Sequence, residues 1–514
     1  MIPADSNATS AWAYRVLVVV VVAAALAFRF QGIWFGYPLA VHPDEHNLVE
    51  RAWSMIWTKD LSPEFFIYPT FNIYLQAALQ AAVTLVLKLL TGIRFSEIPL
   101  ITFYLAGRIS TVLLSAATVY LVFRVARLLV HPLAGLGASI FLGASYLHVT
   151  NSFLVTVDAP AAFWAVLATW MAALVYARAP RPGYYLLAGL FAGLAAGSKY
   201  IAVFALLPLL VAHAARALAG QGWLTKNLAL ALAAAPAAFL ATSPYILLDL
   251  RHFLQDMQGV TAHYRGGHAG NEAAGDRSWH LYAGNLFRQG YGAVPSVLAA
   301  VGIVWLGARN WRKLALLASF PVALFIFVGS YKVFFPRNLV PLVPFLAVLS
   351  GAGLYALARS LTVRVPRAAP AVAAAALALA AAAVVGQAAS AQARITDITL
   401  PDTRWLALQW MESHLPAGTC IAREGGTPVV ESYTDRYRVA YLGYTDVFDE
   451  LARAECADYL ILSSFNYGRF LGNETAYAEE AGSYRSYFRD HQPVAEFTPD
   501  SRTAGGPTIR IYQL

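Results

Sequence analysis

Long runs of apolar residues recur along the first three quarters of the chain, and they limit its possible folds more than any other feature. The first, Ala11 to Phe30, is long enough to cross a bilayer as a helix and lacks an obvious signal cleavage site. Apolar residues make up 58% of the chain and charged residues 13%, about half the usual share in soluble proteins. This composition excludes a soluble multidomain protein, a disordered chain and a secreted disulfide scaffold. It predicts an α-helical polytopic membrane protein.

Eleven segments fit transmembrane helices of about 20 residues. The predicted spans are 12–31, 104–123, 133–151, 160–177, 183–198, 200–217, 227–248, 291–308, 314–330, 338–357 and 369–390. One further apolar stretch, 69–90, is ambiguous, because an extra crossing would invert every later loop. Polar residues interrupt it at Tyr68, Asn72, Tyr74, Gln76, Gln80 and Lys88, which favours a juxtamembrane helix lying along the surface over an ordinary span.

The distribution of charge supports this surface placement. If residues 69–90 do not cross the membrane, the loops that fall on one of its two sides contain basic residues and no Asp or Glu. The basic residues of these loops are Arg124, Arg127, Arg178, Arg181, Arg216, Lys226, Arg309, Arg312, Lys313, Arg359, Arg364 and Arg367. Cytoplasmic loops are enriched in Lys and Arg. We therefore expect a multi-pass membrane protein with a cytoplasmic N-terminus. The expected domains are a transmembrane domain over 1–390, with external loops 32–103 and 249–290, and an extracytoplasmic domain over 391–514.

The C-terminal region differs from the rest of the chain in charge and pattern. Residues 391–514 hold 11 basic and 17 acidic residues, which leaves 26 basic and 12 acidic residues in 1–390. A helix over 403–414, short strands near 420–422, 438–441, 459–463 and 508–512, and a helix over 471–489 predict a small α/β domain. Cys420 and Cys456 both lie here, either as a disulfide or as two buried thiols. The net charge of +8 does not indicate a nucleic-acid partner.

The first external loop begins with an acidic pair, Asp44-Glu45, directly after a predicted span. A carboxylate at a membrane face is partly desolvated, which raises its pKa and favours a general base. The alternative is structural, with Pro43 opening a helix whose first turn holds the acids. His42 and His46 flank the pair and are weak candidates for a divalent metal site, because nothing else completes the ligand set.

The second external loop contains one isolated acid, Asp158, between two apolar spans. It either caps the helix that follows or orients a substrate beside the first-loop carboxylates.

Cations are expected on the same side of the membrane as these acids. They are Arg108 in the second span, Lys199 beside Tyr200 after a run of small residues, and Lys332 and Arg337 around the start of the tenth span. Interfacial cations often only extend toward water. Together, however, they favour a basic ring that holds a lipid-linked phosphate.

The long external loop 249–290 is too polar to cross a membrane. It fits a flexible gate over a membrane-level cavity or a disordered connector equally well. His263 and His268 within it are weak metal candidates.

Taken together, the Asp44-Glu45 pair, the flat helix, Asp158, Gly197-Ser198-Lys199-Tyr200 and the run from Phe335 to Pro344 resemble the C-type integral-membrane glycosyltransferases (GT-C). Within them the chain most resembles the protein O-mannosyltransferase and aminoarabinose-transferase-like branch, the bacterial phospholipid carrier-dependent glycosyltransferases. The resemblance covers roughly residues 10–360, and the C-terminal region resembles the periplasmic tails of some members.

The resemblance implies an inverting transfer of a sugar from a polyprenyl-phosphate donor to an acceptor hydroxyl of a protein, lipid or glycan, on the extracytoplasmic face. It implies Asp44 as the catalytic base, Glu45 as its support and Asp158 as the second-loop carboxylate. Lys199 and Arg337 fall where members hold the carrier phosphate. No cofactor is implied, although His42 and His46 depart from the pattern and leave a metal possible.

Two other classes compete with this interpretation. A polytopic transporter or lipid-linked-sugar flippase predicts charge pairs near span centres and often inverted repeats. Here the acids lie in external loops, and no repeat is evident. A non-catalytic scaffold would leave Asp44 and Glu45 without a role.

Overall fold

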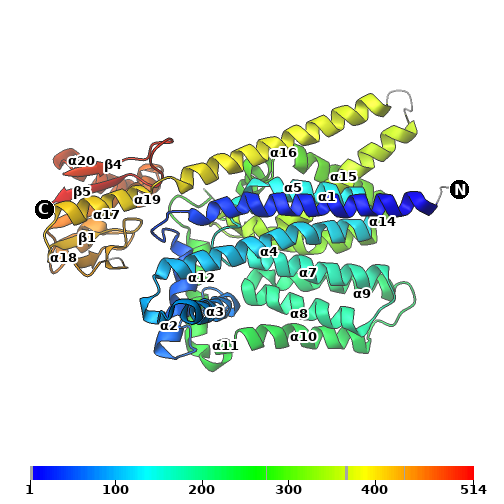
Figure 1. The fold of residues 1–514 in the computed structure, drawn as a ribbon, viewed down its shortest axis with the longest axis horizontal. Coiled ribbons are helices and arrows are strands. Elements are labelled where there is room, and N and C mark those ends of the chain that lie inside the picture. The colour runs from blue at the N-terminus through cyan, green and yellow to red at the C-terminus, as the bar shows by residue number, and fades with distance from the viewer. Residues whose placement is uncertain (1–3, 274, 365–368, 433) are drawn as a thin grey trace. The chain divides into compact units, whose positions relative to one another are not determined.

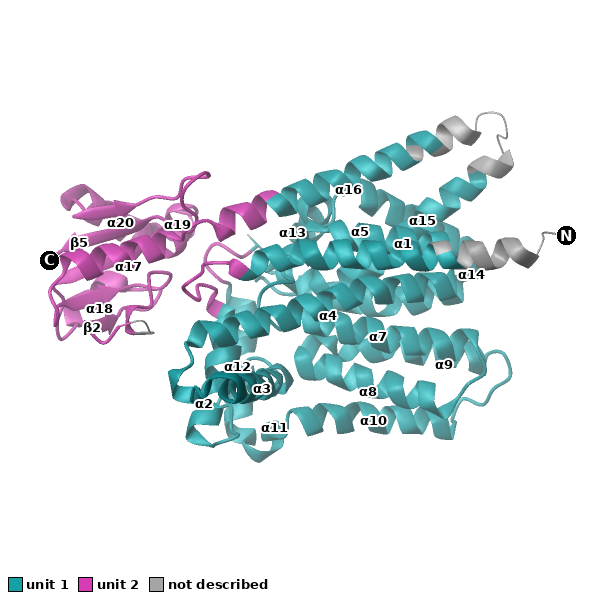
Figure 2. Cartoon of the chain, in the orientation of Figure 1, with its two compact units in different colours: residues 1–33, 44–267, 273–392 teal, residues 34–43, 268–272, 393–514 magenta. Residues whose placement is uncertain are grey.

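The protein was examined as a computed structural model, which describes residues 4–273, 275–364, 369–432 and 434–514. The chain divides into two compact units (Figure 2). Unit 1 comprises residues 1–33, 44–267 and 273–392, and unit 2 comprises residues 34–43, 268–272 and 393–514.

Unit 1 is helical. Its long elements run lengthwise beside one another in Figure 1. The helices are α1 (Ala4–Phe30), α2 (Pro43–Thr58), α3 (Phe71–Thr91), α4 (Leu100–Leu129), α5 (Pro132–Ala144), α6 (Tyr146–Thr150), α7 (Asp158–Ala177), α8 (Pro182–Ser198), α9 (Leu207–Ala217), α10 (Lys226–Thr242), α11 (Tyr245–Leu248), α12 (Leu250–Gly266), α13 (Trp279–Asn285), α14 (Ala293–Gly329), α15 (Val343–Arg364) and α16 (Ala369–Thr399), the last of which ends in unit 2. Short 3₁₀ or π turns join them: η1 (Gln31–Trp34), η2 (Phe95–Glu97), η3 (Tyr200–Leu206), η4 (Leu286–Gly290) and η5 (Pro336–Leu342).

Within the described residues, seven helical segments are long and apolar enough to cross a membrane: Tyr14–Trp34, Phe71–Thr91, Leu100–Leu129, Asp158–Ala177, Tyr200–Ala217, Ala293–Gly329 and Pro336–Ser360. We expected eleven crossings and a flat helix; Phe71–Thr91 is the segment expected to lie flat, so six of the seven candidates correspond to expected crossings. The difference arises because α5, α8 and α10 have only 13, 17 and 17 residues, and because α16 adjoins undescribed residues. In addition, α14 combines two expected spans. They meet at Asn310, whose backbone is not helical (φ −159°, ψ 81°) and whose side-chain oxygen accepts a hydrogen bond from Lys313 N.

Helix α3 is the expected surface segment. Figure 1 shows it nearly end-on, whereas α4, α7 and α8 run lengthwise, so α3 crosses the direction of the bundle. Its polar stripe, however, faces the protein: Asn72, Gln76 and Gln80 are at most 3% exposed, and Gln80 donates to Val49 O. The outward face instead shows Leu85, Val86, Leu89 and Leu90. These three polar residues are therefore buried against the protein rather than facing water, whereas Lys88 is exposed.

A buried arginine holds the break between α5 and α6. At Ser145 the backbone leaves the helix, which frees carbonyl groups in the last turn of α5. Arg29 on α1 is fully buried and donates to Leu142 O and Gly143 O at 3.1 and 3.0 Å. Its remaining hydrogen bonds reach Ala25 O, Ser115, Ser152 and His148. One side chain thus fastens α1, α4, α5 and α6 together.

The C-terminal part of unit 2 is an α/β domain with one five-stranded sheet in the order β2-β1-β3-β5-β4. Strands β1, β2 and β3 are parallel, whereas β5 is antiparallel to β3 and to β4. Its elements are α17 (Thr403–His414), β1 (Cys420–Arg423), η6 (Val430–Ser432), β2 (Arg438–Tyr441), α18 (Val447–Arg453), β3 (Tyr459–Ser463), α19 (Ser464–Leu471), α20 (Ala478–Asp490), β4 (Ala495–Phe497) and β5 (Ile509–Gln513).

The sheet has an apolar cluster on each face. Ile421 and Ile461 pack with Leu408 and Met411 of α17 on one face. Helices α19 and α20 cover the other face, where Phe470 and Tyr484 belong to a second cluster with Leu460 and Leu462. The expected helix over 471–489 was wrong in its first part, because the chain leaves α19 at Leu471 and re-enters a helix only at Ala478.

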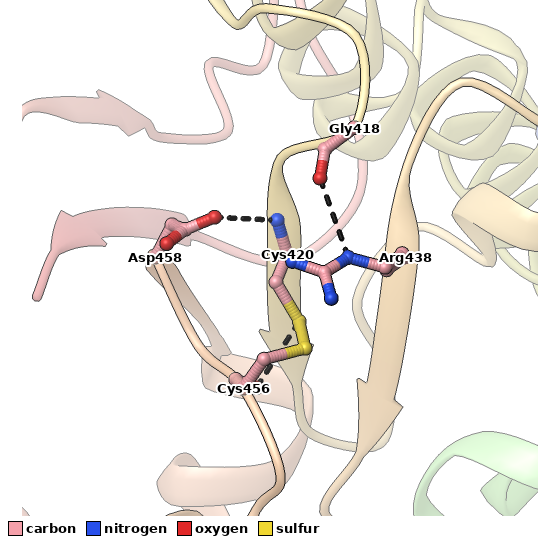
Figure 3. The surroundings of a disulfide bond; sticks show 5 residues. All are labelled: Gly418, Cys420, Arg438, Cys456 and Asp458. Carbon is pink, nitrogen blue, oxygen red and sulfur yellow. Dashed lines mark hydrogen bonds between the residues drawn. A yellow bond between two sulfur atoms is a disulfide. The ribbon is translucent and has the colours of Figure 1, made fainter.

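Cys420 and Cys456 form a disulfide, so the first of the two alternatives for these residues holds (Figure 3). Cys420 opens β1, and its backbone N–H donates to Asp458 Oδ2 at 2.7 Å. The bond therefore joins the start of β1 to the segment that leads into β3.

Candidate functional site

The acidic pair lies in the first turn of α2, which Pro43 opens. Proline suits this position because its missing N–H has no partner there, and carboxylates at a helix N-terminus are favoured by the helix dipole. The structural alternative for the pair is thus present. It does not account for the contacts of the two side chains, which point to different partners.

Glu45 is fully buried in an ion pair with Arg108 of α4. The guanidinium binds both carboxylate oxygens, with Nε–Oε1 at 2.9 Å and Nη2–Oε2 at 2.6 Å. Val155 N also donates to Glu45 Oε1, and Arg108 donates to Ile33 O. Neither side chain is accessible, so this pair joins α2, α4 and the loop before α7 and holds the start of α2 in place.

Asp44 has a more open position. Its Oδ2 lies 3.1 Å from Nη2 of Arg337, in an ion pair in which Asp44 is 16% and Arg337 30% exposed. Arg337 belongs to η5 and stacks over the ring of Phe335 at 4.5 Å. The carboxylate is therefore both reachable and held beside a cation.

A second ion pair, between Lys199 and Asp158, lies beside the pair formed by Asp44 and Arg337. Lys199 separates α8 from η3 in an extended conformation, and its Nζ lies 2.6 Å from Oδ1 of Asp158, the first residue of α7. The same ammonium donates to Oδ1 of Asn338 at 2.7 Å. Because Asn338 directly follows Arg337, the two pairs are adjacent.

Lys199, Arg337 and Asn338 line one cavity of about 370 Å³ in unit 1. Tyr68, Tyr200 and Tyr264 add hydroxyl groups to its wall. Most of the remaining wall is apolar and is formed by Ile67, Met257, Val260, Phe327, Val328 and Phe335. The cavity thus combines a mainly apolar wall with a small number of charged groups that lie close together.

Tyr68 precedes α3 and lies partly buried in the cavity wall. Burial raises its pKa well above the ordinary tyrosine value, and the carboxylates of Asp44 and Asp158 raise it further. Its hydroxyl therefore stays protonated and can donate a hydrogen bond. The sequence had marked Tyr68 only as an interruption of an apolar run.

Of the other predicted site residues, two lie outside the cavity wall and one lines it. Arg108 is buried with Glu45, and Lys332 is directed to Gly266 O at 3.3 Å; neither is part of the cavity wall. Tyr200 does line the cavity, where its hydroxyl donates to Phe66 O. Neither Asn338 nor Tyr282 was predicted as a site residue. Asn338 lies in the run from Phe335 to Pro344 that carries the resemblance, directly after Arg337, and this was the available signal.

The histidines considered for metal binding have other contacts. His46 bonds Glu50 and the hydroxyl of Tyr104, each at 2.7 Å, and His42 packs its ring edge to face with Phe35. His263 lines the cavity, and His268 bonds Arg469. Across the part of the chain that the structure describes, no group of three or more His, Cys, Asp or Glu side chains could hold a metal ion.

The segment 249–290, predicted to be a long external loop, is largely helical. Helix α12 covers Leu250–Gly266 and contributes Met257, Val260 and Tyr264 to the cavity. It is tied to the segment between α2 and α3 because Asp256 accepts a hydrogen bond from Phe66 N at 2.7 Å. A disordered connector is thus the wrong description of this part of the loop.

Comparisons with known proteins agree with this architecture. The sequence model of the family described as dolichyl-phosphate-mannose-protein mannosyltransferase matches residues 102–247. A search of curated protein sequences finds no match.

Three solved structures are similar over most of the chain. ArnT from Cupriavidus metallidurans in the apo state has 15% identity and a TM-score of 0.57, with 98% of each chain covered. ArnT bound to undecaprenyl phosphate has 14% identity and a TM-score of 0.56, covering 96% of this chain and 97% of the other. The Archaeoglobus fulgidus oligosaccharyltransferase in its apo form has 13% identity and a TM-score of 0.57, covering 89% and 71%. The predicted fold, a polytopic α-helical protein with a C-terminal α/β domain, is confirmed by these similarities.

Proposed function

We propose that this chain, which has the fold of the C-type integral-membrane glycosyltransferases, moves a sugar from a polyprenyl-phosphate donor to an acceptor hydroxyl, with inversion. The observation that carries the proposal is the meeting of two ion pairs, Asp44–Arg337 and Asp158–Lys199, at one cavity with a mainly apolar wall. An isoprenoid chain suits such a wall, and cations beside carboxylates suit a phosphate leaving group near a nucleophile. ArnT, which is similar over nearly its whole length, has been solved with undecaprenyl phosphate.

Asp44 is the proposed general base. It takes the proton of the acceptor hydroxyl as the oxygen attacks the anomeric carbon. The bond from that carbon to the phosphate oxygen breaks, and the electron pair leaves with the phosphate. Arg337 and Lys199 stabilise the charge that develops there, and Asp158 holds Lys199 in position. The negative charge of the carboxylates also favours an oxocarbenium-like sugar.

The test uses purified protein in lipid nanodiscs with a panel of polyprenyl-phosphate sugars and native membranes as the source of acceptor. Carrier release and sugar transfer are measured together. Asp44→Asn should lower the rate by about 10²- to 10⁴-fold, because a positioned base contributes a factor of this size. Asp60→Asn is the matched control, because Asp60 is an exposed carboxylate of the same external loop. An unchanged rate in Asp44→Asn would remove the base assignment.

We further propose that the site and the domain of residues 391–514 are extracytoplasmic, in the inner membrane of a bacterium. The Cys420–Cys456 disulfide supports this, because such bonds persist in oxidising compartments. A cysteine introduced at exposed Ser501 should react with a membrane-impermeant thiol reagent in intact cells. Protection of this cysteine, combined with labelling after cell lysis, would contradict the proposed topology.

A further inference from the structure

The ammonium group of Lys199 has three N–H donors, and two of them have partners in the structure. One donates to Asp158 Oδ1 at 2.6 Å and another to Asn338 Oδ1 at 2.7 Å. Lys199 is 9% exposed and lines the cavity. Fixing two donors of a tetrahedral group restricts the direction of the third, so these partners decide where the remaining donor can reach.

Asn338 can serve Lys199 only with its amide oxygen, because an ammonium has no acceptor. Its amide nitrogen then points away and needs an acceptor of its own, since the side chain is only 2% exposed. The hydroxyl oxygen of Tyr282 meets this need, at 3.1 Å from Asn338 Nδ2. The Tyr282 hydroxyl thus completes the amide orientation in which Oδ1 of Asn338 faces Lys199.

Tyr282 is itself firmly placed. It is fully buried on α13, and its hydroxyl also accepts a hydrogen bond from Phe335 N at 3.3 Å. Its ring packs edge to face on Phe334 at 4.8 Å. At the N-terminus of α13, Ser278 donates to Gly329 O and to Tyr331 O. The hydroxyl is thus held from both the helix and the loop that precedes Arg337.

We propose that Tyr282 is a positioning residue that acts through Asn338 to orient the Lys199 ammonium toward the carrier phosphate. The inference rests on the proposed function. Tyr282 itself is not part of the cavity wall, so it is not placed to touch the phosphate. Replacing it with phenylalanine keeps the ring and removes the hydroxyl, which accepts hydrogen bonds from Asn338 Nδ2 and Phe335 N. The buried amide nitrogen of Asn338 then lacks this acceptor, so the amide that holds Lys199 is less firmly placed.

The experiment is a double-mutant cycle on the binding of a sugar-free polyprenyl monophosphate to the full-length protein in nanodiscs. Tyr282→Phe should weaken binding by about 5-fold, because the hydrogen bond that holds Asn338 in its orientation is lost. In a Lys199→Met background the same substitution should change binding less than about 2-fold, because the group that it orients is absent. A merely structural role would cost the same in both backgrounds.

Tyr291→Phe is the matched control. Tyr291 is also buried in unit 1, and its hydroxyl lies 2.8 Å from Ser350 Oγ, but it is not part of the cavity wall. It should leave the affinity for the probe unchanged. If Tyr282→Phe lowers the yield of folded protein, binding is measured on the folded fraction isolated by size-exclusion chromatography, with the same loss of about 5-fold expected.

The outcomes separate this inference from the function on which it rests. Failure of the wild-type protein to bind the probe would overturn the proposed function. Binding by the wild type, with either no loss in Tyr282→Phe or an equal loss in both backgrounds, would overturn only the role of Tyr282.

Discussion

Glu45 in unit 1 and Glu424 in the C-terminal domain are both fully buried carboxylates, but they are stabilised in different ways. Glu45 binds a cation through both oxygens, the guanidinium of Arg108. Glu424 follows β1 and accepts hydrogen bonds from uncharged donors instead. These are Ser463 N, Asn466 Nδ2 and the Tyr484 hydroxyl, at 2.5, 2.8 and 2.5 Å.

The difference determines how each carboxylate responds to pH. Burial raises the pKa of Glu424 to about 7, although the bonds from Asn466, Ser463 and Tyr484 and the charge of Arg469 act in the opposite direction. Uncharged donors thus only partly offset the loss of water. Glu45, in contrast, has a permanently charged partner, because arginine does not titrate in this range. Glu45 therefore acts as a structural link between helices, whereas the raised pKa of Glu424 makes the domain that holds it sensitive to pH.

The largest effect is expected when Glu45 loses its side chain. Glu45→Ala leaves the guanidinium of Arg108 buried without a carboxylate, which costs about 3–5 kcal/mol. We expect a large fall in thermal stability in detergent, with loss of the folded fraction on size-exclusion chromatography. The double variant Glu45→Met with Arg108→Met should be more stable than the single variant, because no unpaired charge remains. Equal stability of the two would show that the pair is not the source of the effect.

A smaller and pH-dependent effect is expected at Glu424. Its pKa is about 7 in the folded protein against an ordinary value of 4.5. The folded state therefore binds more protons between these values, and its stability falls as the pH rises. The contribution of protonated Glu424 to the free energy of unfolding is fully present below pH 4.5 and is lost as the pH rises through 7. Its size is at most about 3 kcal/mol, from about 1.4 kcal/mol for each pH unit.

Glu424→Gln tests this, because the amide cannot ionise. Hydrogen exchange of peptides covering β1 and β3 in the full-length protein should show the wild type losing protection relative to Glu424→Gln as the pH rises from 5 to 8. The comparison is made after correction for the intrinsic exchange rate. Parallel behaviour of the two proteins over this range would mean that Glu424 does not titrate there.

Much of the architecture was predictable, because it follows from the lengths and periods of apolar runs. Helix α17 has the predicted bounds, and β2 and β3 agree with their predicted positions to the residue. Strand β4 was missed, since Ala495–Phe497 is too short for a pattern. The orientation of the polar stripe on α3 could not be predicted either. Amphipathicity shows that two faces differ, but not which of them meets protein.

The sequence predicted which charged residues belong to the candidate site, but not which of them form ion pairs with one another. The sequence indicated that Asp44, Asp158, Lys199 and Arg337 share one side of the membrane. It could not indicate that Asp44 pairs with Arg337 while its neighbour Glu45 pairs with Arg108. Adjacent residues on a helix point in directions about 100° apart, and only tertiary packing decides what each meets. For the same reason, Tyr282 carries no signal in its own segment.

The arginine that fastens the α5–α6 break also sets the phase of the first helix. Arg29 and Asp44 are separated by a fixed stretch of chain, and Arg29 reaches its partners only from one side of α1. Inserting one residue ahead of Arg29 within α1 would rotate everything before it by about 100° relative to everything after. The register of α1 at Arg29 is therefore fixed by the hydrogen bonds of a single guanidinium.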